Sequence, residues 1–230
     1  MSQVQAATKS EVIYRDCDGV PMANNTIQYG WIVMIQQNLN WLFADNPNVF
    51  VAGDLFWYPV EGRNTIAVAP DVLVAIGRPK GDRLFYKQWE EDNIPPQVIF
   101  EVLSPSSTRQ EMDEKLLFFD RYGVEEYYIY DSDANQLWGW LRGEEGLAAI
   151  DSMQNWVSPQ LSIRFDPAGD FLQLYRPDEQ PFLSYAEIAQ QSLQLQQQLK
   201  QTEQQLEQER LRSQALEEHL RSLELDQGQA

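Results

Sequence analysis

The stretch "QVIFEVLSPSSTRQEMDEK", residues 97–115, decides the fold of this chain. Its apolar first half predicts a buried strand, and Thr108 followed three residues later by Glu111 is typical of a helix-capping box. A strand that leads directly into a helix favours an α/β domain. However, Glu101 lies in the strand and Lys115 lies on the apolar side of the helix, where charges are unfavourable unless paired or bound. The same stretch therefore predicts a fold and a functional site.

Segments on both sides of this stretch also predict helices and strands. A first helix is predicted from Asn25 or Thr26 onward, with apolar residues at helical spacing at Ile27, Trp31, Met34, Ile35, Leu39 and Leu42. A second helix should run from about Thr108 to Tyr122 and end at Gly123. Strands are predicted within residues 48–59, 65–77, 97–103, 125–131 and 135–143, the last two as a hairpin. We expect an α/β domain around a mostly buried central sheet.

Charge and histidine content narrow the chemistry. The net charge is −18 over 230 residues, which weighs against a protein that coats nucleic acid through a basic surface. The one histidine, His219, lies in a polar tail, which excludes Ser-His and Cys-His pairs and the usual zinc sites. The one cysteine, Cys17, cannot form an internal disulfide. Carboxylates, lysine, tyrosine and metal-activated water remain as catalytic groups.

Composition also predicts the location and the domain plan. The first ten residues lack the features of a signal peptide, and no segment approaches the about 18 apolar residues of a membrane span. We therefore expect a soluble cytoplasmic protein without membrane contact. The predicted plan is an N-terminal extension over residues 1–24, one domain over 25–183 and a helical segment over 184–230.

The C-terminal segment has the pattern of an imperfect coiled coil. It is rich in Gln, Glu and Leu, all good helix formers. Apolar residues alternate at spacings of three and four with polar residues in the same seam: Ile188, Leu195, Leu199, Leu206, Leu216, Leu220 and Leu223, and between them Ser192, Thr202, Glu209 and Ser213. We expect a homo-oligomer, a dimer or higher, or docking on a partner helix. The alternative is a long solvated helix.

Two acidic residues in apolar surroundings predict a metal site. Asp71 follows Pro70 inside "IAVAPDVLVAI", where a buried strand is expected and a bulge is one way to direct its carboxylate out of the ladder. Glu101 occupies the corresponding place in the next apolar run, so adjacent strands can bring the two together. Hard oxygen ligands of this kind suit Mg²⁺ or Mn²⁺. Taken alone, Asp71 could instead pair with an arginine or cap a turn.

Lys115 is predicted to complete this site. At about 100° per residue it shares a helix face with apolar neighbours: Met112, Leu116, Phe119 and Tyr122. Its ammonium group could point to the two carboxylates, where it would balance charge and stabilise a phosphate. The alternative is that the side chain extends to the edge of the apolar face and leaves its charge in water.

At these positions the sequence resembles the Uma-two family of endonucleases, in the restriction-endonuclease-like PD-(D/E)XK superfamily. The resemblance rests on "PDVLVAIG", "IFEVLSPSS", Lys115 and "RYGVEEYYIYD", and covers about residues 25–175. The segments "GDLFWYP" and "GRPKGDRLFYKQWEEDNIPPQ" look like a cyanobacterial branch of the family. The resemblance implies a central mixed sheet flanked by helices.

The resemblance also implies roles for individual residues. Asp71 and Glu101 would be catalytic metal ligands for Mg²⁺ or Mn²⁺, a backbone carbonyl at Val102 would add a ligand, and Lys115 would be the catalytic lysine. Asp54 and Ser104 are secondary candidates. The sequence departs from the family at Phe119, where many members have tyrosine, and at Gln28, where histidine is frequent; the superfamily's usual lysine position holds Leu103.

The implied function is metal-dependent hydrolysis of phosphodiester bonds, with DNA as the expected substrate. Contacts to DNA are predicted at a set of basic residues: Arg63, Arg78, Lys80, Arg83, Lys87 and Arg109. One alternative is a catalytically silent binding or assembly module that oligomerises through its C-terminal helix. Another is glycoside hydrolysis by Asp71 and Glu101, which gives Lys115 no task.

Overall fold

A computed structural model describes residues 12–16 and 23–227, with side chains as far as residue 217. Cys17 lies outside the described residues, as do most of residues 1–24 and the side chain of His219. The chain divides into two compact units, residues 1–182 and 183–230. The predicted domain limits at residues 24 and 183 stay predictions.

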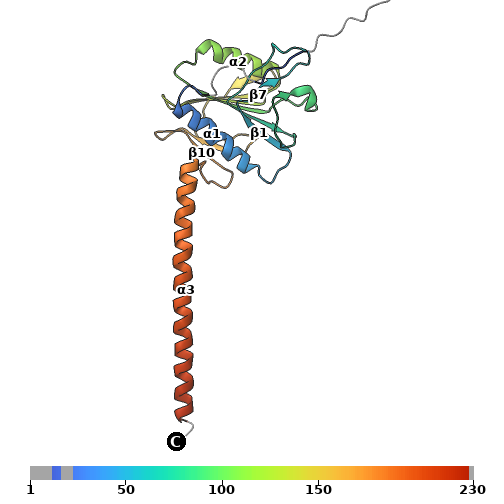
Figure 1. The fold of residues 1–230 in the computed structure, drawn as a ribbon. Helices are drawn as coiled ribbons and strands as arrows, with labels where there is room; N and C mark the ends of the chain where they lie inside the picture. The colour runs from blue at the N-terminus through green and yellow to red at the C-terminus, as the bar shows by residue number, and fades with distance from the viewer. Residues whose placement is uncertain (1–11, 17–22, 228–230) are drawn as a thin grey trace, which may run out of the picture. The chain divides into compact units, whose positions relative to one another are not determined.

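A six-stranded sheet forms the centre of the first unit (Figure 1), in the order β1-β3-β5-β6-β7-β8. Only the β5–β6 pair is parallel, and the other four pairs are antiparallel, so the sheet is mixed as predicted. The strands of this sheet are β1 (Val49–Gly53), β3 (Val72–Ile76), β5 (Val98–Leu103), β6 (Glu126–Asp131), β7 (Gln136–Gly143) and β8 (Gly146–Ala149). Two small sheets pair β2 (Trp57–Tyr58) with β4 (Tyr86–Lys87), and β9 (Arg164–Asp166) with β10 (Gln173–Tyr175); the 3-10 helix η1 is Gln88–Glu90.

Two helices cover opposite faces of this sheet (Figure 1). Helix α1 (Thr26–Leu42) packs with Val51, Val72 and Phe100 in one core. Helix α2 (Arg109–Arg121) packs through Phe119 on the other face, whose core includes Leu73, Ile99 and Tyr127. Alternate residues of β3, β5 and β6 therefore enter different cores, as expected for strands buried on both faces. Glu101, two residues after Ile99, belongs to the face that α2 covers.

Both predicted helices are confirmed, and their ends follow from local sequence. Thr108 caps α2 with a complete capping box that includes Glu111, and Gly123 follows the helix with a left-handed φ of 89°. Asn25 caps α1 by accepting a hydrogen bond from Gln28. The predicted apolar face of α1 was partly wrong, because Ile27 is 55% exposed whereas Gln28 is buried.

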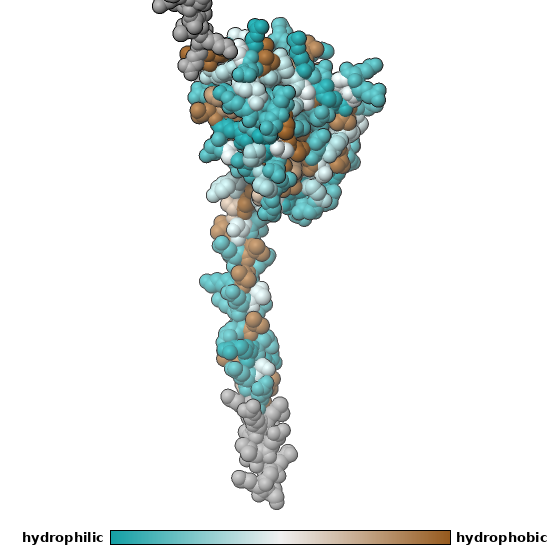
Figure 2. Space-filling view, turned by 90° about the vertical axis from the view of Figure 1, so that its right-hand side faces the viewer, coloured by the Kyte–Doolittle hydropathy of each residue, from teal (hydrophilic) through white to brown (hydrophobic). Residues whose placement is uncertain are grey.

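The second unit is one long helix, α3 (Tyr185–Gln227). The apolar seam predicted from the sequence is exposed wherever its side chains are described, from Ile188 to Leu216. Figure 2 shows these apolar side chains spaced along a hydrophilic column. Leu220 and Leu223 lie beyond the described side chains. Among the described residues, no helix is both long and apolar enough to span a membrane.

Candidate active site

Three carboxylates lie in one row, Asp54 directly after β1, Asp71 directly before β3 and Glu101 within β5. The β1–β3 ladder pairs Gly53 with Val72, and the β3–β5 ladder pairs Val72 with Phe100. Continued by one residue, the same registers place Asp54 opposite Asp71, and Asp71 opposite Glu101. Side chains at directly opposed positions of antiparallel strands have Cβ atoms about 5 Å apart. The row therefore brings together the two predicted metal ligands and one secondary candidate.

Asp71 lies at the end of its strand and not within it. It precedes Val72, the first residue of β3, so the prediction of a strand position is corrected: no bulge is needed, because the ladder stops here. Its Oδ2 accepts a hydrogen bond of 2.6 Å from the Val102 amide. Asp54 has a left-handed φ of 48°, and its amide donates to the Asp71 carbonyl at 3.2 Å. These contacts hold the end of β3 between its neighbours.

Lys115 points to Glu101. Its Nζ lies 2.7 Å from Glu101 Oε2, and its side chain is 34% exposed, compared with 7% for Glu101. The ammonium group therefore contacts the Glu101 carboxylate although the side chain is partly exposed, which favours the first of the two sequence-based alternatives. The alternative of glycoside hydrolysis by Asp71 and Glu101 gave Lys115 no task, and it does not explain why this lysine pairs with Glu101.

Burial and neighbouring negative charge raise the pKa of both Asp71 and Glu101. Burial, and then the charge of Glu101, raises the pKa of Asp71 to about 8. Burial likewise raises the pKa of Glu101, although Lys115 acts in the opposite direction. Burial acts to lower the pKa of Lys115, but the charge of Glu101 outweighs it and the pKa is raised. One lysine therefore does not fully compensate the negative charge of this row.

A divalent cation fits this imbalance. Glu101 Oε1 is buried and has no hydrogen-bond partner among the described residues. A buried polar atom without a partner costs about 1–3 kcal/mol, and more when it is charged. Carboxylate oxygens are the ligands that Mg²⁺ and Mn²⁺ prefer. Within the described part of the chain no three acidic, histidine or cysteine side chains form a ready metal cage, so the fit rests on Asp71, Glu101 and backbone oxygen.

The Val102 carbonyl and Ser104, two further predicted site groups, both form hydrogen bonds with other parts of the chain. The Val102 carbonyl, a predicted metal ligand, accepts a hydrogen bond of 2.8 Å from Gln28 Nε2, which leaves its second lone pair for another partner. Ser104 is buried, but its hydroxyl contacts Asn24, Ser106 and Ser107. The structure therefore places Ser104 in a separate polar cluster at the start of α2.

Two residues without a predicted role also lie at the site. Gln28, noted in the sequence only as a departure from the family pattern, is buried and donates to the Val102 carbonyl. Tyr127 is fully buried on the α2 face of the sheet, and its hydroxyl has no partner among the described residues. Burial, and then the charges of Glu101 and Asp71, raises the pKa of this phenol.

Comparison with known protein families identifies the family to which this chain belongs. The sequence model of the Uma2 family, described as "Putative restriction endonuclease", matches residues 32–216, which include the three carboxylates, Lys115 and Tyr127. This chain belongs to the Uma2 family. No curated protein matches the sequence. Among solved structures, a nuclease of Anabaena variabilis ATCC 29413, described as "putative" and as belonging to DUF820, aligns at 14% identity and a TM-score of 0.44, over 59% of this chain and 72% of that one.

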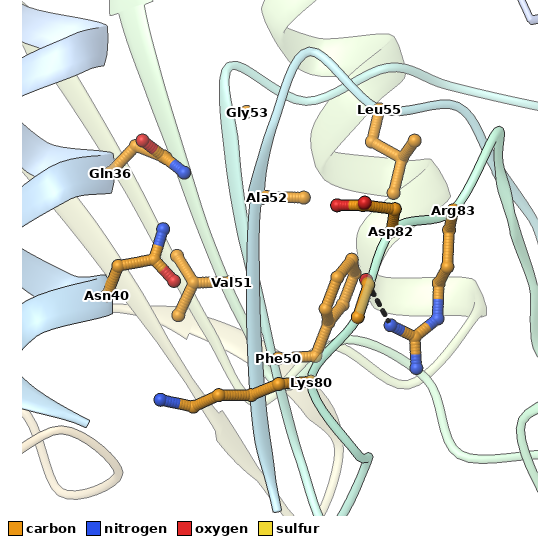
Figure 3. Close-up of a pocket in the computed structure, with 11 residues that line it drawn as sticks. Gln36, Asn40, Phe50, Val51, Ala52, Gly53, Leu55, Lys80, Asp82 and Arg83 are labelled. Atoms are coloured by element: carbon orange, nitrogen blue, oxygen red, sulfur yellow. Dashed lines mark hydrogen bonds between the residues drawn. The ribbon is translucent and has the colours of Figure 1, made fainter. Parts of the chain in front are cut away.

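This Uma2 protein has a surface groove beside the row of acids. The groove encloses about 390 Å³ over the free edge of β1, the first strand of the sheet. Gln36 and Asn40 of α1 line one side, and Asp82 and Arg83 line the other (Figure 3). Gly53 and Leu55 also line it, and they flank Asp54. The groove therefore ends next to the candidate site.

Most basic residues near this groove already have partners in the Uma2 chain. Arg78 and Arg83 both pair with Glu91, and Arg78 also pairs with Asp92. Lys80 donates to the carbonyls of Phe43 and Ala44, and Lys87 pairs with Glu90. Of the six residues predicted to contact DNA, Arg63 and Arg109 are exposed and make neither an ion pair nor a side-chain hydrogen bond within the described residues, whereas the exposed Lys80 is held by backbone carbonyls. Their role in binding DNA stays a prediction, and the structure favours these two.

Proposed function

We propose that this Uma2 protein is a metal-dependent endonuclease that hydrolyses phosphodiester bonds in DNA in the cytoplasm. The observation that carries this proposal is the Lys115–Glu101 ion pair beside Asp71, in a row where negative charge exceeds positive charge. A folded protein tolerates such an excess when a cation or a substrate completes the site. Membership of a family described as restriction endonucleases supports the same chemistry.

Each residue of the row has a defined task in this proposal. Asp71 and Glu101, with the Val102 carbonyl, would hold Mg²⁺ or Mn²⁺. The ion, when bound, supplies an electrophile for the phosphate and acidifies water at neutral pH. Lys115, anchored on Glu101 Oε2, would orient the attacking water and stabilise the charge that develops on the phosphate. Asp54 would add negative charge that strengthens cation binding.

The groove over β1 offers a path for the substrate. Its amide side chains and the free edge of β1 can donate hydrogen bonds to phosphate or to bases, and it leads to Asp54. We place a strand of the DNA substrate in this groove, with Arg109 at the start of α2 and Arg63 as exposed cations.

The test is nicking of supercoiled plasmid with Mg²⁺ or Mn²⁺, beside calorimetry of metal binding. Asp71→Asn, Glu101→Gln and Lys115→Met should each lower cleavage by about 100-fold or more, and the two carboxylate variants should also weaken metal binding. Asp113→Asn is the matched control, since Asp113 is an exposed carboxylate of α2. Cleavage that persists in all three variants, or that is equally lost in the control, would contradict the assignment.

A second proposal concerns assembly. We infer that α3 associates with a second copy of itself, because its seam of Leu and Ile side chains is exposed along most of its length. The paired basic residues and the net charge of −18 also keep open the alternative of a silent assembly module. Wild-type protein that self-associates but neither binds metal nor cleaves any nucleic acid would favour that alternative.

A further inference from the structure

Tyr127 is buried where a core tyrosine has no evident purpose. Its side chain is inaccessible to solvent, and phenylalanine would fill the same space. Phe119 of α2 and Trp140 of β7 hold its ring, at centroid distances of 4.8 and 5.4 Å. The ring is therefore fixed, yet the hydroxyl donates to no group among the described residues. Buried tyrosine hydroxyls usually have a partner.

The position of Tyr127 relates it to the row of acids. Tyr127 of β6 pairs with Ile99 of β5, two residues before Glu101 on the same face of the sheet. Lys115 and Phe119 lie one helical turn apart on α2, and they contact Glu101 and Tyr127 respectively. The electrostatic influence of Glu101 and Asp71 on the phenol agrees with this neighbourhood.

The two unpartnered atoms of this region are chemically complementary. Glu101 Oε1 can accept a hydrogen bond and the Tyr127 hydroxyl can donate one, but the two atoms do not bond to each other. A buried water molecule between them would satisfy both. We propose that Tyr127 is a positioning residue whose hydroxyl donates to a buried water molecule, which in turn donates to Glu101 Oε1 and fixes this carboxylate in place. This inference rests on the proposed nuclease function and adds a group to it.

The neighbouring tyrosine provides a matched control. Tyr128 lies on the other face of the sheet, where its hydroxyl donates to Glu126 Oε2 at 2.9 Å and accepts from Trp156 Nε1 at 3.0 Å. Tyr127→Phe and Tyr128→Phe remove the same atom from adjacent buried residues. Only the second removes hydrogen bonds within the folded protein.

The experiment compares these two variants with wild type in the full chain. Urea unfolding in EDTA measures stability without metal, and plasmid nicking with Mg²⁺ or Mn²⁺ measures kcat and KM. We expect Tyr127→Phe to be at least as stable as wild type, with kcat lowered about tenfold or more and KM little changed. Tyr128→Phe should lose stability and keep the kcat of the folded protein.

The outcomes separate this inference from the function on which it rests. If wild type cleaves and Tyr127→Phe cleaves equally well, the positioning role is wrong while the nuclease proposal stands. If Tyr127→Phe instead loses as much stability as Tyr128→Phe with kcat unchanged, its hydroxyl is structural. If wild type shows no metal-dependent cleavage of any nucleic acid, the nuclease proposal fails and this role fails with it.

Discussion

Single residues in this protein show how the same kind of charge can be either structural or functional. Glu91 and Glu101 are both buried carboxylates that contact basic side chains. Glu91 lies between Arg78 and Arg83, and both its oxygens are used. Glu101 has one lysine and one oxygen without a partner in the described residues. Complete pairing indicates a structural contact, whereas incomplete pairing indicates a site that another group completes.

The ion pairs of Glu91 with Arg78 and Arg83 predict that the free energy of unfolding depends on pH. Burial acts to raise the pKa of Glu91, but hydrogen bonds and charge from Arg83 and Arg78 lower it below its ordinary value of 4.5. A carboxylate with a lowered pKa in the folded state stabilises that state above its unfolded pKa, and the effect is lost as pH falls through the folded value. Glu91→Gln should therefore cost about 3 kcal/mol at pH 7, and less as the pH falls below 4.5.

Urea unfolding of wild type and Glu91→Gln at neutral and acidic pH measures this difference. Glu90→Gln is the control, because Glu90 is adjacent but 58% exposed in its pair with Lys87, and its effect should stay within about 0.5 kcal/mol. A difference between wild type and Glu91→Gln that is the same at both pH values would show that the ion pair does not cause it.

At the scale of elements, helix α3 carries a repeat that predicts how two copies would pair. In a parallel two-stranded coiled coil each seam residue faces its own copy, so Glu209 would meet the same carboxylate of the second chain. The seam would also place Arg212 near Glu217 of the second copy, with opposite charges at flanking positions. The pattern thus combines a favourable pair for parallel pairing with one unfavourable contact inside the seam.

Replacing the unfavourable contact should strengthen association. Glu209→Leu removes the repulsion between two carboxylates and adds apolar area, so the dissociation constant of the dimer should fall about tenfold or more. Glu207→Leu makes the same substitution two residues away, outside the seam, and should have little effect. Sedimentation equilibrium measures both. Equal effects of the two substitutions would contradict the seam, and a monomer in all three proteins would contradict association through α3.

On the scale of the whole molecule, the acidic surface and the proposed substrate must be compatible. A net charge of −18 repels DNA at long range, and several basic residues are engaged within the protein. Under the proposed function, binding would therefore depend on short-range donors in the groove and on a cation held by the carboxylates, rather than on a basic surface. We expect weak binding with a small salt dependence.

A charge placed in the groove tests this arrangement. Gln36→Glu adds one negative charge to the groove, and Gln37→Glu adds the same charge one residue along α1, at an exposed position outside it. In fluorescence anisotropy with a labelled single-stranded oligonucleotide, the first should weaken binding about tenfold, and the second less than about twofold. Equal weakening would indicate only the change in net charge, and unchanged binding in both would place the strand elsewhere.

Local sequence was sufficient for the three helices and for β1, β3, β5, β6 and β7, whereas β4, β8, β9 and β10 were not predicted and the seam of α3 stays a prediction. A capping box such as Thr108 with Glu111 acts over three residues. The alternation of apolar and polar residues in a strand, and the heptad spacing of a coiled coil, likewise recur within one segment. For the same reason Glu101 and Lys115 stood out, because each breaks the pattern of its own element.

The sequence predicted that Asp71, Glu101 and Lys115 share a site, but only the tertiary structure decided how they are placed and which other residues contact them. The row of Asp54, Asp71 and Glu101 depends on the registers of two ladders, and sequence patterns do not define register between strands. The burial of Gln28 depends on the Val102 carbonyl, 74 residues away, and the pairing of Arg78 and Arg83 depends on Glu91. The hydroxyl of Tyr127 acquired significance only beside Glu101. Contacts of this kind join residues that are distant in the sequence, so their partners are defined by packing and not by local pattern.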